Sequence, residues 1–319
     1  MFFNSRLLRM KRSITLNQLF WRLRYVFILI FFSSTNVQAQ SDTLNKKRLI
    51  FVGSTTAAAY TGTMLTLNQA WYANYPRSAF HAINDNAEWL QMDKVGHAWS
   101  AYGYTIAGIE VMKWTGMPRK KAIWIAGIGA LFFQTSLELF DGFSAEWGAS
   151  SGDMIANTLG AALAVGQGLA WDEQRFQVKM SFHPTEYNDI RPNLLGDKFP
   201  TDMLKDYNGQ TYWLSVNPWS FAKESQWPKW LNVSLGYGGD GMLGGHSNIW
   251  TDAFGIRQDY SFVKRQRQLY LSFDIDLQHV PIKNQFLKRL ARMANIIKIP
   301  APTLMYQEGG KWQFYPLYF

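Results

Sequence analysis

The chain contains no cysteine among its 319 residues. Disulfide bonds are therefore excluded, and so are metal sites built on thiolates and a lipid attached through a cysteine at an N-terminal cleavage point. The sequence also has no internal repeat, no low-complexity tract and no HExxH motif. Its glycine-rich segment at residues 238–245 lacks the strand and helix that flank a nucleotide-binding loop. No cofactor is expected from these motifs.

The N-terminus has the three regions of a secretory signal: a basic start, an apolar run at residues 25–32, and small residues at Val37 and Ala39. The apolar run is shorter than the roughly 20 residues of a membrane-spanning helix, which predicts cleavage before Gln40. Residues 1–39 hold six basic residues and no acidic ones, so cleavage lowers the formal net charge from +9 to +3. This small charge argues against a nucleic acid as partner. We expect a protein exported to the cell envelope, facing the periplasm and associated with either the inner or the outer membrane.

Four segments rich in small and weakly polar residues follow the signal, and each is long enough for a helix. They are residues 49–71, 97–114, 122–140 and 153–171. Turn-forming residues separate them, so we predict a four-helix bundle as a domain over residues 40–172. Glycine and alanine in the last two segments suit close helix packing in lipid or in water. A membrane-embedded bundle and a soluble bundle therefore both stay open.

After this region the apolar periodicity changes to two. Residues 173–211 are polar and contain several prolines and aspartates, which predicts a connector. Alternating apolar and polar residues at 231–237 and 269–277 predict half-buried strands in a β-rich region over residues 212–319. Residues 283–298 have a helical period with basic residues on one face, which predicts an amphipathic helix that either covers the sheet or lies on anionic lipid. The expected fold class is α+β, with the helical bundle first and an antiparallel β-rich region with one amphipathic helix after it.

Three short polar clusters stand at ends of the predicted helices. In an antiparallel bundle the second and fourth helices start at the end where the third helix finishes, so the clusters converge on one layer. The candidate catalytic residues, one from each cluster, are His97, Glu138 and Asp153. The candidate binding residues are Asp93, Lys94, Asp141, Ser151 and Asn157.

Ordinary structural roles exist for several of these residues. Asp93 is a suitable helix N-cap, Ser150 and Asp153 fit a capping box, and Asp141 before a glycine suits a helix stop. His97 and Glu138 are not caps, and an ion pair would be their structural role. A purely structural cluster therefore stays open beside a functional one.

The order of the clusters resembles a known family. Asp93-Lys94-Val95-Gly96-His97, then Glu138-Leu139-Phe140-Asp141, then the spaced residues Gly148, Ser151, Asp153, Asn157 and Gly160 resemble the YfiM-like predicted periplasmic lipoproteins, a family of unknown function. More distantly, the same order resembles the VanZ-like membrane proteins. Residues 191–193 and 205–213 look like the C-terminal extension of longer envelope proteins in the Bacteroidota. The missing cysteine and the missing arginine of the last VanZ-like motif are departures, so the resemblance implies a location and no chemistry.

Two functions fit these observations. The first is a non-enzymatic envelope protein whose polar layer binds a lipid head group or a partner, or only fixes helix packing. The second is a hydrolase or transferase acting on an envelope lipid or glycan, with His97 as general acid or base, Glu138 or Asp153 orienting it and Lys94 holding an anionic group. In a variant of the second, His97, Glu138 and Asp153 bind a divalent metal, although no metal is assigned. The expected partner is a membrane lipid or another envelope component, and the sequence leaves a protein partner and enzymatic activity open.

Overall fold

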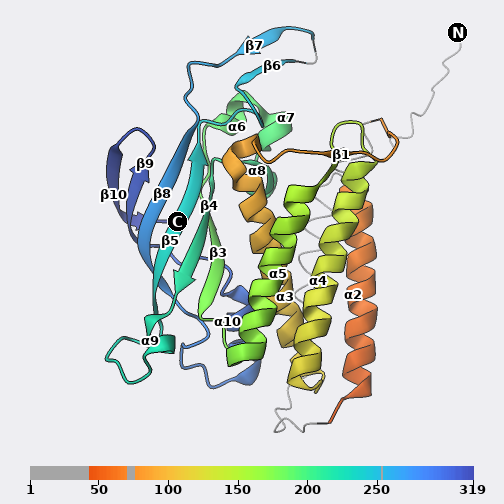
Figure 1. The fold of residues 1–319 in the computed structure, drawn as a ribbon, viewed down its shortest axis with the longest axis vertical. Helices are drawn as coiled ribbons and strands as arrows, with labels where there is room; N and C mark the ends of the chain where they lie inside the picture. The colour runs from red at the N-terminus through yellow and green to blue at the C-terminus, as the bar shows by residue number, and fades with distance from the viewer. Residues whose placement is uncertain (1–42, 70–75, 253) are drawn as a thin grey trace, which may run out of the picture. The chain divides into compact units, whose positions relative to one another are not determined.

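A computed structural model describes residues 43–69, 76–252 and 254–319 (Figure 1). The predicted export signal at residues 1–39 lies outside these residues. Residues 42–319 form one compact unit. Within this unit a layer of long helices packs against a large antiparallel sheet (Figure 1).

Four long helices make up the helical layer. They are α2 (Lys46–Leu67), α3 (Met92–Trp114), α4 (Arg119–Gly142) and α5 (Ser151–Trp171). The side chain of Asn45 caps α2 by accepting a hydrogen bond from the backbone N–H of Arg48 at 3.0 Å. Gly116 has a φ of +82° in the short turn between α3 and α4, a backbone conformation that glycine adopts without strain. The turn therefore makes α3 and α4 antiparallel neighbours.

Glycines allow α3, α4 and α5 to approach closely. A Cβ on Gly160 of α5 would lie 2.0 Å from the carbonyl oxygen of Ala98 in α3, and a Cβ on Gly127 of α4 would lie 2.5 Å from Val165. By contrast, α2 lies beside α4 (Figure 1), where the Tyr60 hydroxyl donates to Ser136 Oγ at 2.9 Å. The closely packed part of the layer is thus three helices, with α2 at its edge.

The main sheet has six antiparallel strands in the order β10-β9-β8-β5-β4-β3. Their bounds are β3 (Phe176–Phe182), β4 (Gln210–Val216), β5 (Leu231–Asp240), β8 (Gln266–Ile275), β9 (Ala301–Gln307) and β10 (Lys311–Tyr318). Two small sheets accompany it: a parallel pair β1 (Ala82–Ile83) and β2 (Ala149–Ser150), and an antiparallel hairpin β6 (Ile249–Thr251) and β7 (Arg257–Asp259). The strand expected at residues 231–237 lies within β5, and the one expected at 269–277 coincides with β8 up to Ile275, where β8 ends.

One face of β3 and β4 packs against α3 and α5. Met92 of α3, Met180 of β3 and Tyr212 of β4 belong to one buried apolar cluster. The indole N–H of Trp99 in α3 donates to the carbonyl oxygen of Ile296 at 3.0 Å, which ties α3 to the end of α10 (Gln285–Ala294). The start of α3 is therefore held from two sides, by helices and by the sheet.

The opposite face of the sheet is buried, with polar side chains beside an apolar cluster of Trp213, Tyr270, Met305 and Tyr318. Lys179 of β3 and Asp274 of β8 are both fully buried, and their side chains pair at 2.5 Å. Lys179 Nζ also donates to the carbonyl oxygen of Ile275 at 2.8 Å and to Asn295 Oδ1 at 2.9 Å. The alternation along these strands thus buries the polar side chains, whereas several of the apolar ones are exposed.

The predicted fold class is wrong. The helical part does not form a four-helix bundle followed by a separate β-rich region, because α3 and α5 cover β3 and β4 and share a core with them. The described residues contain nine α-helices, including four short ones in loops: α6 (Tyr187–Ile190), α7 (Pro192–Leu195), α8 (Thr201–Lys205) and α9 (Pro218–Phe221). Among these residues α4 alone is long and apolar enough to cross a membrane, by length and composition. Periodicity located the long helices, but it does not specify which element each face packs against.

Candidate functional site

Side chains from three helices and two loops meet at one end of the helical layer. Asp93, Lys94 and His97 lie in the first turns of α3, Glu138 lies near the end of α4, and Asp153 and Asn157 lie in the first turns of α5. The ends of these helices lie side by side in Figure 1. The convergence of the three clusters expected from antiparallel topology is present.

Local structure aims these side chains at one another. Ser150 caps α5 by accepting a hydrogen bond from the N–H of Asp153 at 3.1 Å, and its own N–H donates to Glu138 Oε2 at 3.0 Å. Gly96 faces the Tyr212 hydroxyl, which would lie 2.7 Å from a Cβ at that position. Small residues at Gly96 and Gly160 therefore let α3 lie close to both the sheet and α5, so that His97 reaches the carboxylates.

Lys94 binds three carboxylates. Its Nζ lies 2.7 Å from Asp85 Oδ2, 2.9 Å from Asp93 Oδ2 and 2.8 Å from Asp153 Oδ1. The lysine side chain is 13% exposed, so these partners compete with little water. Lys94 thus neutralises acidic groups of the cluster rather than standing ready for an anionic ligand, the role that the sequence suggested for it.

His97 is oriented by its Nδ1 atom. Nδ1 lies 3.2 Å from Asn157 Oδ1, and that oxygen also accepts a hydrogen bond from Gln134 Nε2 at 2.7 Å. Because the amide of Gln134 donates to it, the atom of Asn157 facing His97 is an acceptor, and Nδ1 carries the proton of the neutral ring. Glu138 Oε1 lies 3.8 Å from the same nitrogen. The lone pair of the neutral imidazole is consequently on Nε2.

Nε2 of His97 faces two carboxylate oxygens. Asp93 Oδ1 and Asp153 Oδ1 each lie 3.7 Å from it. The ligand atoms of these three residues all lie within 4.8 Å of one another, which is close enough for one metal ion to contact all of them. The His97 side chain is 22% exposed, so the imidazole is not fully enclosed.

Three polar atoms beside the imidazole have no hydrogen-bond partner among the described residues. They are Glu138 Oε1, Asn157 Nδ2 and Asp153 Oδ1, the last of which is ion-paired with Lys94, and their residues are only 4%, 0% and 5% exposed. Buried polar atoms are usually paired, so such atoms mark a place where a proton, water or ligand belongs.

The charges of the cluster shift each other's titration. Burial raises the pKa of Glu138 to about 7 and that of Asp153 to about 6. Burial alone would lower the pKa of His97, but the carboxylates of Asp93, Asp153 and Glu138 outweigh it and raise that pKa. Burial alone would also raise the pKa of Asp93, yet the charges of His97 and Lys94 hold it below its usual value. Lys94 has a raised pKa for the converse reason, because its carboxylate partners outweigh burial.

Two predicted residues lie at the margin of the cluster. Asp141, in the last turn of α4, acts on Glu138 through its charge, which contributes to raising the pKa of Glu138. Ser151 is the first residue of α5 and is exposed, whereas the capping hydroxyl belongs to its neighbour Ser150. Neither residue lies among the atoms that face Nε2 of His97.

Sequence reasoning missed three residues of the cluster. Asp85 accepts a hydrogen bond from Ser150 Oγ at 2.6 Å besides its ion pair with Lys94, and nothing in the polar run around it marked it. Tyr207 donates to Asp93 Oδ1 at 2.5 Å, and it lies in the tail segment that carried part of the family resemblance. Gln134 is buried on α4, one turn before Glu138, and its amide fixes Asn157.

Residues 148–152 read Gly-Ala-Ser-Ser-Gly and fit the spacing of a serine-hydrolase elbow, a motif that the sequence reading overlooked. Ser150 follows a short strand and precedes α5, but its backbone is extended at φ −102° and ψ 123° rather than strained. Its hydroxyl donates to Asp85 and accepts from the N–H of Asp153. The structure therefore shows a capping serine whose hydroxyl is fully engaged.

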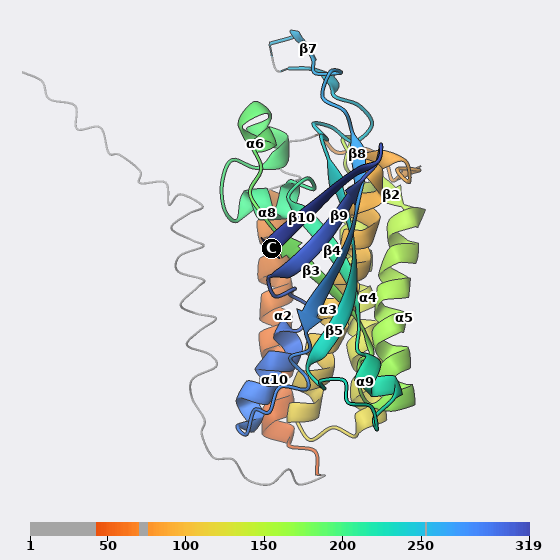
Figure 2. The same ribbon diagram turned by 90° about the vertical axis from the view of Figure 1, so that its left-hand side faces the viewer.

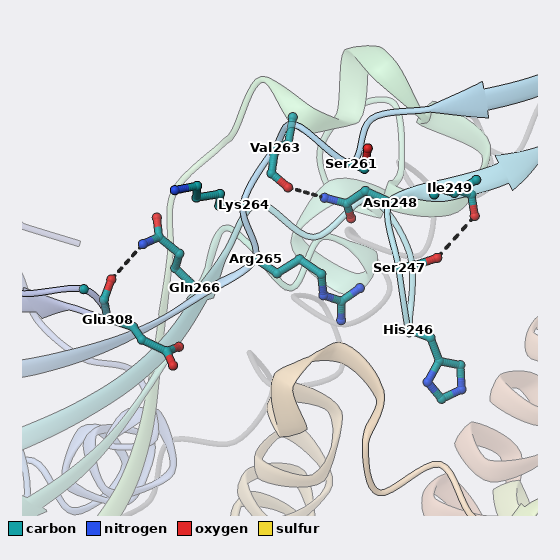
Figure 3. Close-up of a pocket in the computed structure, with 11 residues that line it drawn as sticks. His246, Ser247, Asn248, Ile249, Ser261, Val263, Lys264, Arg265, Gln266 and Glu308 are labelled. Atoms are coloured by element: carbon teal, nitrogen blue, oxygen red, sulfur yellow. Dashed lines mark hydrogen bonds between the residues drawn. The ribbon is translucent and has the colours of Figure 1, made fainter.

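An open pocket of about 550 Å³ lies elsewhere, between the β6–β7 hairpin and the β9–β10 turn. Figure 3 shows the side chains around it, among them His246, Lys264, Arg265 and Glu308. None of the predicted site residues lines this pocket. The His97 cluster is compact and lies apart from it.

The comparisons with known proteins bear on location. Residues 83–167 match a family model described as predicted periplasmic lipoprotein (DUF2279). No curated protein and no solved structure matches the chain. The match confirms the predicted localisation: the protein is exported to the cell envelope, faces the periplasm and is associated with a membrane. The finer resemblance to YfiM-like and VanZ-like proteins stays a prediction.

Proposed function

We propose that this envelope protein binds a divalent metal ion through Asp93, His97 and Asp153. The observation that carries the proposal is the arrangement around Nε2 of His97, where Asp93 Oδ1 and Asp153 Oδ1 each lie 3.7 Å from the ring nitrogen and all three atoms lie within 4.8 Å of one another. In the neutral-ring state all three atoms are acceptors, and a metal ion between them would add to the partners that the two carboxylate oxygens already have, Tyr207 on Asp93 and Lys94 on Asp153. The spacing suits a metal ion, since ligands about 2.1 Å from an ion lie roughly 3.4 Å apart in tetrahedral geometry.

The groups around His97 Nδ1 support this assignment. Histidines that bind metals usually donate their other ring N–H to a carboxylate or carbonyl oxygen, which fixes the ring and its tautomer. Here Nδ1 lies 3.2 Å from Asn157 Oδ1 and 3.8 Å from Glu138 Oε1. The variant weighed from the sequence had Glu138 as a ligand. The geometry favours Asp93 in that place, with Glu138 as a residue that positions the imidazole.

The three ligands determine which metal ions suit the site and what the bound ion could contact. One imidazole and two carboxylates suit Zn²⁺ or Mn²⁺ better than Mg²⁺, which prefers oxygen ligands alone. Three protein ligands leave a position open for water or for an oxygen of an envelope component, such as a lipid phosphate or a glycan. This makes the partner expected from the sequence, a membrane lipid or envelope component, part of the same proposal. The shared order of Asp-Lys-x-x-His, Glu and Asp-x-x-x-Asn with YfiM-like and VanZ-like proteins supports treating these residues as one site.

Calorimetry and elemental analysis of the purified chain test the proposal. After removal of metals with a chelator, titration with Zn²⁺ or Mn²⁺ should give about one equivalent bound. His97→Ala, Asp93→Asn and Asp153→Asn should each abolish this binding, while His246→Ala and Asp259→Asn at exposed positions should not. Asn157→Leu should weaken binding by about 10–100-fold, because it removes the acceptor that orients the ring.

The outcome that refutes the proposal is equally concrete. Less than about a tenth of an equivalent in folded protein, or unchanged binding in the three ligand variants, would reject the metal site. Circular dichroism of every variant separates these results from loss of the fold. An equal loss of folded protein in His97→Ala, Glu138→Gln and Asp153→Asn would show instead that the cluster only fixes helix packing.

A further inference from the structure

The uncovered part of the sheet carries two continuous rows of apolar side chains. Strand register places Leu235, Leu271, Leu304 and Phe314 side by side across β5, β8, β9 and β10. A second row on the same face runs through Tyr237, Leu269, Tyr306 and Trp312. We call these two rows the sheet-face strip.

Six of the eight residues of the strip are exposed, and Tyr237 and Tyr306 are partly buried. Leu235 is 60% exposed, Leu271 48% and Phe314 63%. The same face is covered where β3 and β4 meet α3 and α5, through residues such as Met180 and Tyr212, and at Tyr237 of β5, which packs against the same cluster. In Figure 2 the strands β9 and β10 lie in front, and no helix covers them. The strip is therefore the uncovered continuation of a face that is otherwise part of the core.

These strands expose apolar side chains and bury polar ones, which is the reverse of the usual pattern of a sheet with one face in water. Next to the exposed Leu271 and Phe273, the side chains of Ser272 and Asp274 point to the other face and are buried. Antiparallel sheets with one face in water place polar residues on that face and apolar residues inside. Strands with apolar residues outside and polar residues inside are typical of contact with lipid. Contiguous exposed apolar surface of this kind marks a site of interaction with a membrane or another protein.

The charges at one end of the strip identify the kind of partner. None of the eight residues of the strip is charged. The end of the sheet next to the β9–β10 turn carries Lys264, in the loop before β8, and Lys311, the first residue of β10, both exposed, together with the partly buried Arg267 of β8. Two acids lie at the same end: Glu308, 3.9 Å from Arg267, and the partly buried Asp240, which pairs with Gln266 of β8 in the strand register. An uncharged apolar surface that ends in basic residues is complementary to acyl chains below anionic head groups.

We propose that the sheet-face strip lies against the acyl region of a membrane, with Lys264, Arg267 and Lys311 at the level of anionic phosphate groups. This surface is separate from the His97 cluster and does not depend on metal binding. In this proposal the protein contacts the membrane through its sheet rather than through its helices.

The absence of cysteine allows single-site labelling of the full chain. Leu271→Cys and Phe314→Cys place an environment-sensitive fluorophore in the strip, and Ser225→Cys places it at an exposed loop position outside the strip as the control. With vesicles of phosphatidylcholine and phosphatidylglycerol, the two strip positions should show a blue shift and quenching by acyl-chain quenchers, whereas the control should show neither. Vesicles of phosphatidylcholine alone should bind at least several-fold more weakly, and added salt should reduce the difference.

Two further results decide between lipid and other occupants. A Leu235→Gln/Leu271→Gln variant that remains folded should lose vesicle binding, and Lys264→Gln/Lys311→Gln should lose the preference for phosphatidylglycerol. The proposal is overturned if vesicles leave the strip fluorophores unchanged. It is also overturned if the fluorophores are blue-shifted without vesicles while light scattering gives twice the mass of the chain, because a second copy then covers the strip.

Discussion

The fully buried ion pair between Lys179 and Asp274 offers a quantitative test of the polar interior of the sheet. The 2.5 Å separation corresponds to an attraction of roughly 7 kcal/mol at an effective dielectric of 20, most of which offsets the desolvation of the two charges. Lys179→Met removes the paired cation and leaves Asp274 with the Ser215 hydroxyl at 3.0 Å, the N–H of Ile299 at 3.3 Å and the charge of the neighbouring Lys298. Breaking a buried pair in this way costs about 3–5 kcal/mol. For a unit of this size that corresponds to a fall in Tm of about 6–20 °C.

Urea unfolding followed by circular dichroism measures this free energy directly. The exposed Lys283→Met variant is the matched control and should change the free energy of unfolding by less than about 0.5 kcal/mol. The double variant Lys179→Met/Asp274→Leu should recover a substantial part of the loss, because neither charge of this pair remains. A loss below about 1 kcal/mol for Lys179→Met, or a double variant as unstable as the sum of the single ones, would refute the reasoning.

Three more predictions follow from particular contacts. Gly160→Ala should disrupt the packing of α3 against α5 and lower the free energy of unfolding by more than about 2 kcal/mol, because the added Cβ would lie 2.0 Å from a backbone oxygen. Gly129 has open space around it, so Gly129→Ala should leave the free energy of unfolding unchanged or raise it by up to about 1 kcal/mol in the same urea assay. Burial lowers the pKa of Lys298 to about 8 from 10.5, so the unfolded chain binds its proton more tightly and stability should rise between pH 8 and 10. The free-energy difference between the wild type and Lys298→Met should therefore change by up to about 3 kcal/mol over that range, and a constant difference would contradict it. Tyr207→Phe should weaken metal binding by about 10–100-fold through loss of the hydrogen bond to Asp93, while Tyr187→Phe, which removes a similar bond to Asp240, should leave it unchanged in calorimetry.

The part of the candidate site that follows from helix spacing and from the order of the helices was predictable from the sequence. Asp93 and His97 are four residues apart and share a helix face, and antiparallel connections bring the start of α5 and the end of α4 to the same place. The partners of Lys94 were not predictable, because one of them, Asp85, lies in an irregular loop. Tyr207 reaches Asp93 across 114 residues of chain, through a tertiary contact that no periodicity encodes.

The sequence also could not predict which face of the sheet is buried. Alternation along β8 correctly indicated a strand, but a period of two gives the same pattern whichever face is buried. Leu271 and Ser272 alternate in either case, and only the fold shows that the serine is inside. The prediction of a separate bundle failed for a related reason. The apolar residues of α3 and α5 fit other helices as well as they fit a sheet, so composition could not distinguish a helical core from a mixed one.

The two proposals concern different parts of the chain, and this separates their consequences. Asp93, His97 and Asp153 all lie within residues 83–167, the segment that matches the family model, whereas the sheet-face strip lies wholly outside it. The two parts nevertheless touch, because Tyr237 of the strip donates to the carbonyl oxygen of Leu90 at 2.5 Å, just before α3 begins. A sheet bound to lipid would thus hold the first turn of α3, and with it Asp93 and His97, at a fixed distance from the membrane surface. A metal ion with an open position there would meet the parts of envelope components that project from that surface.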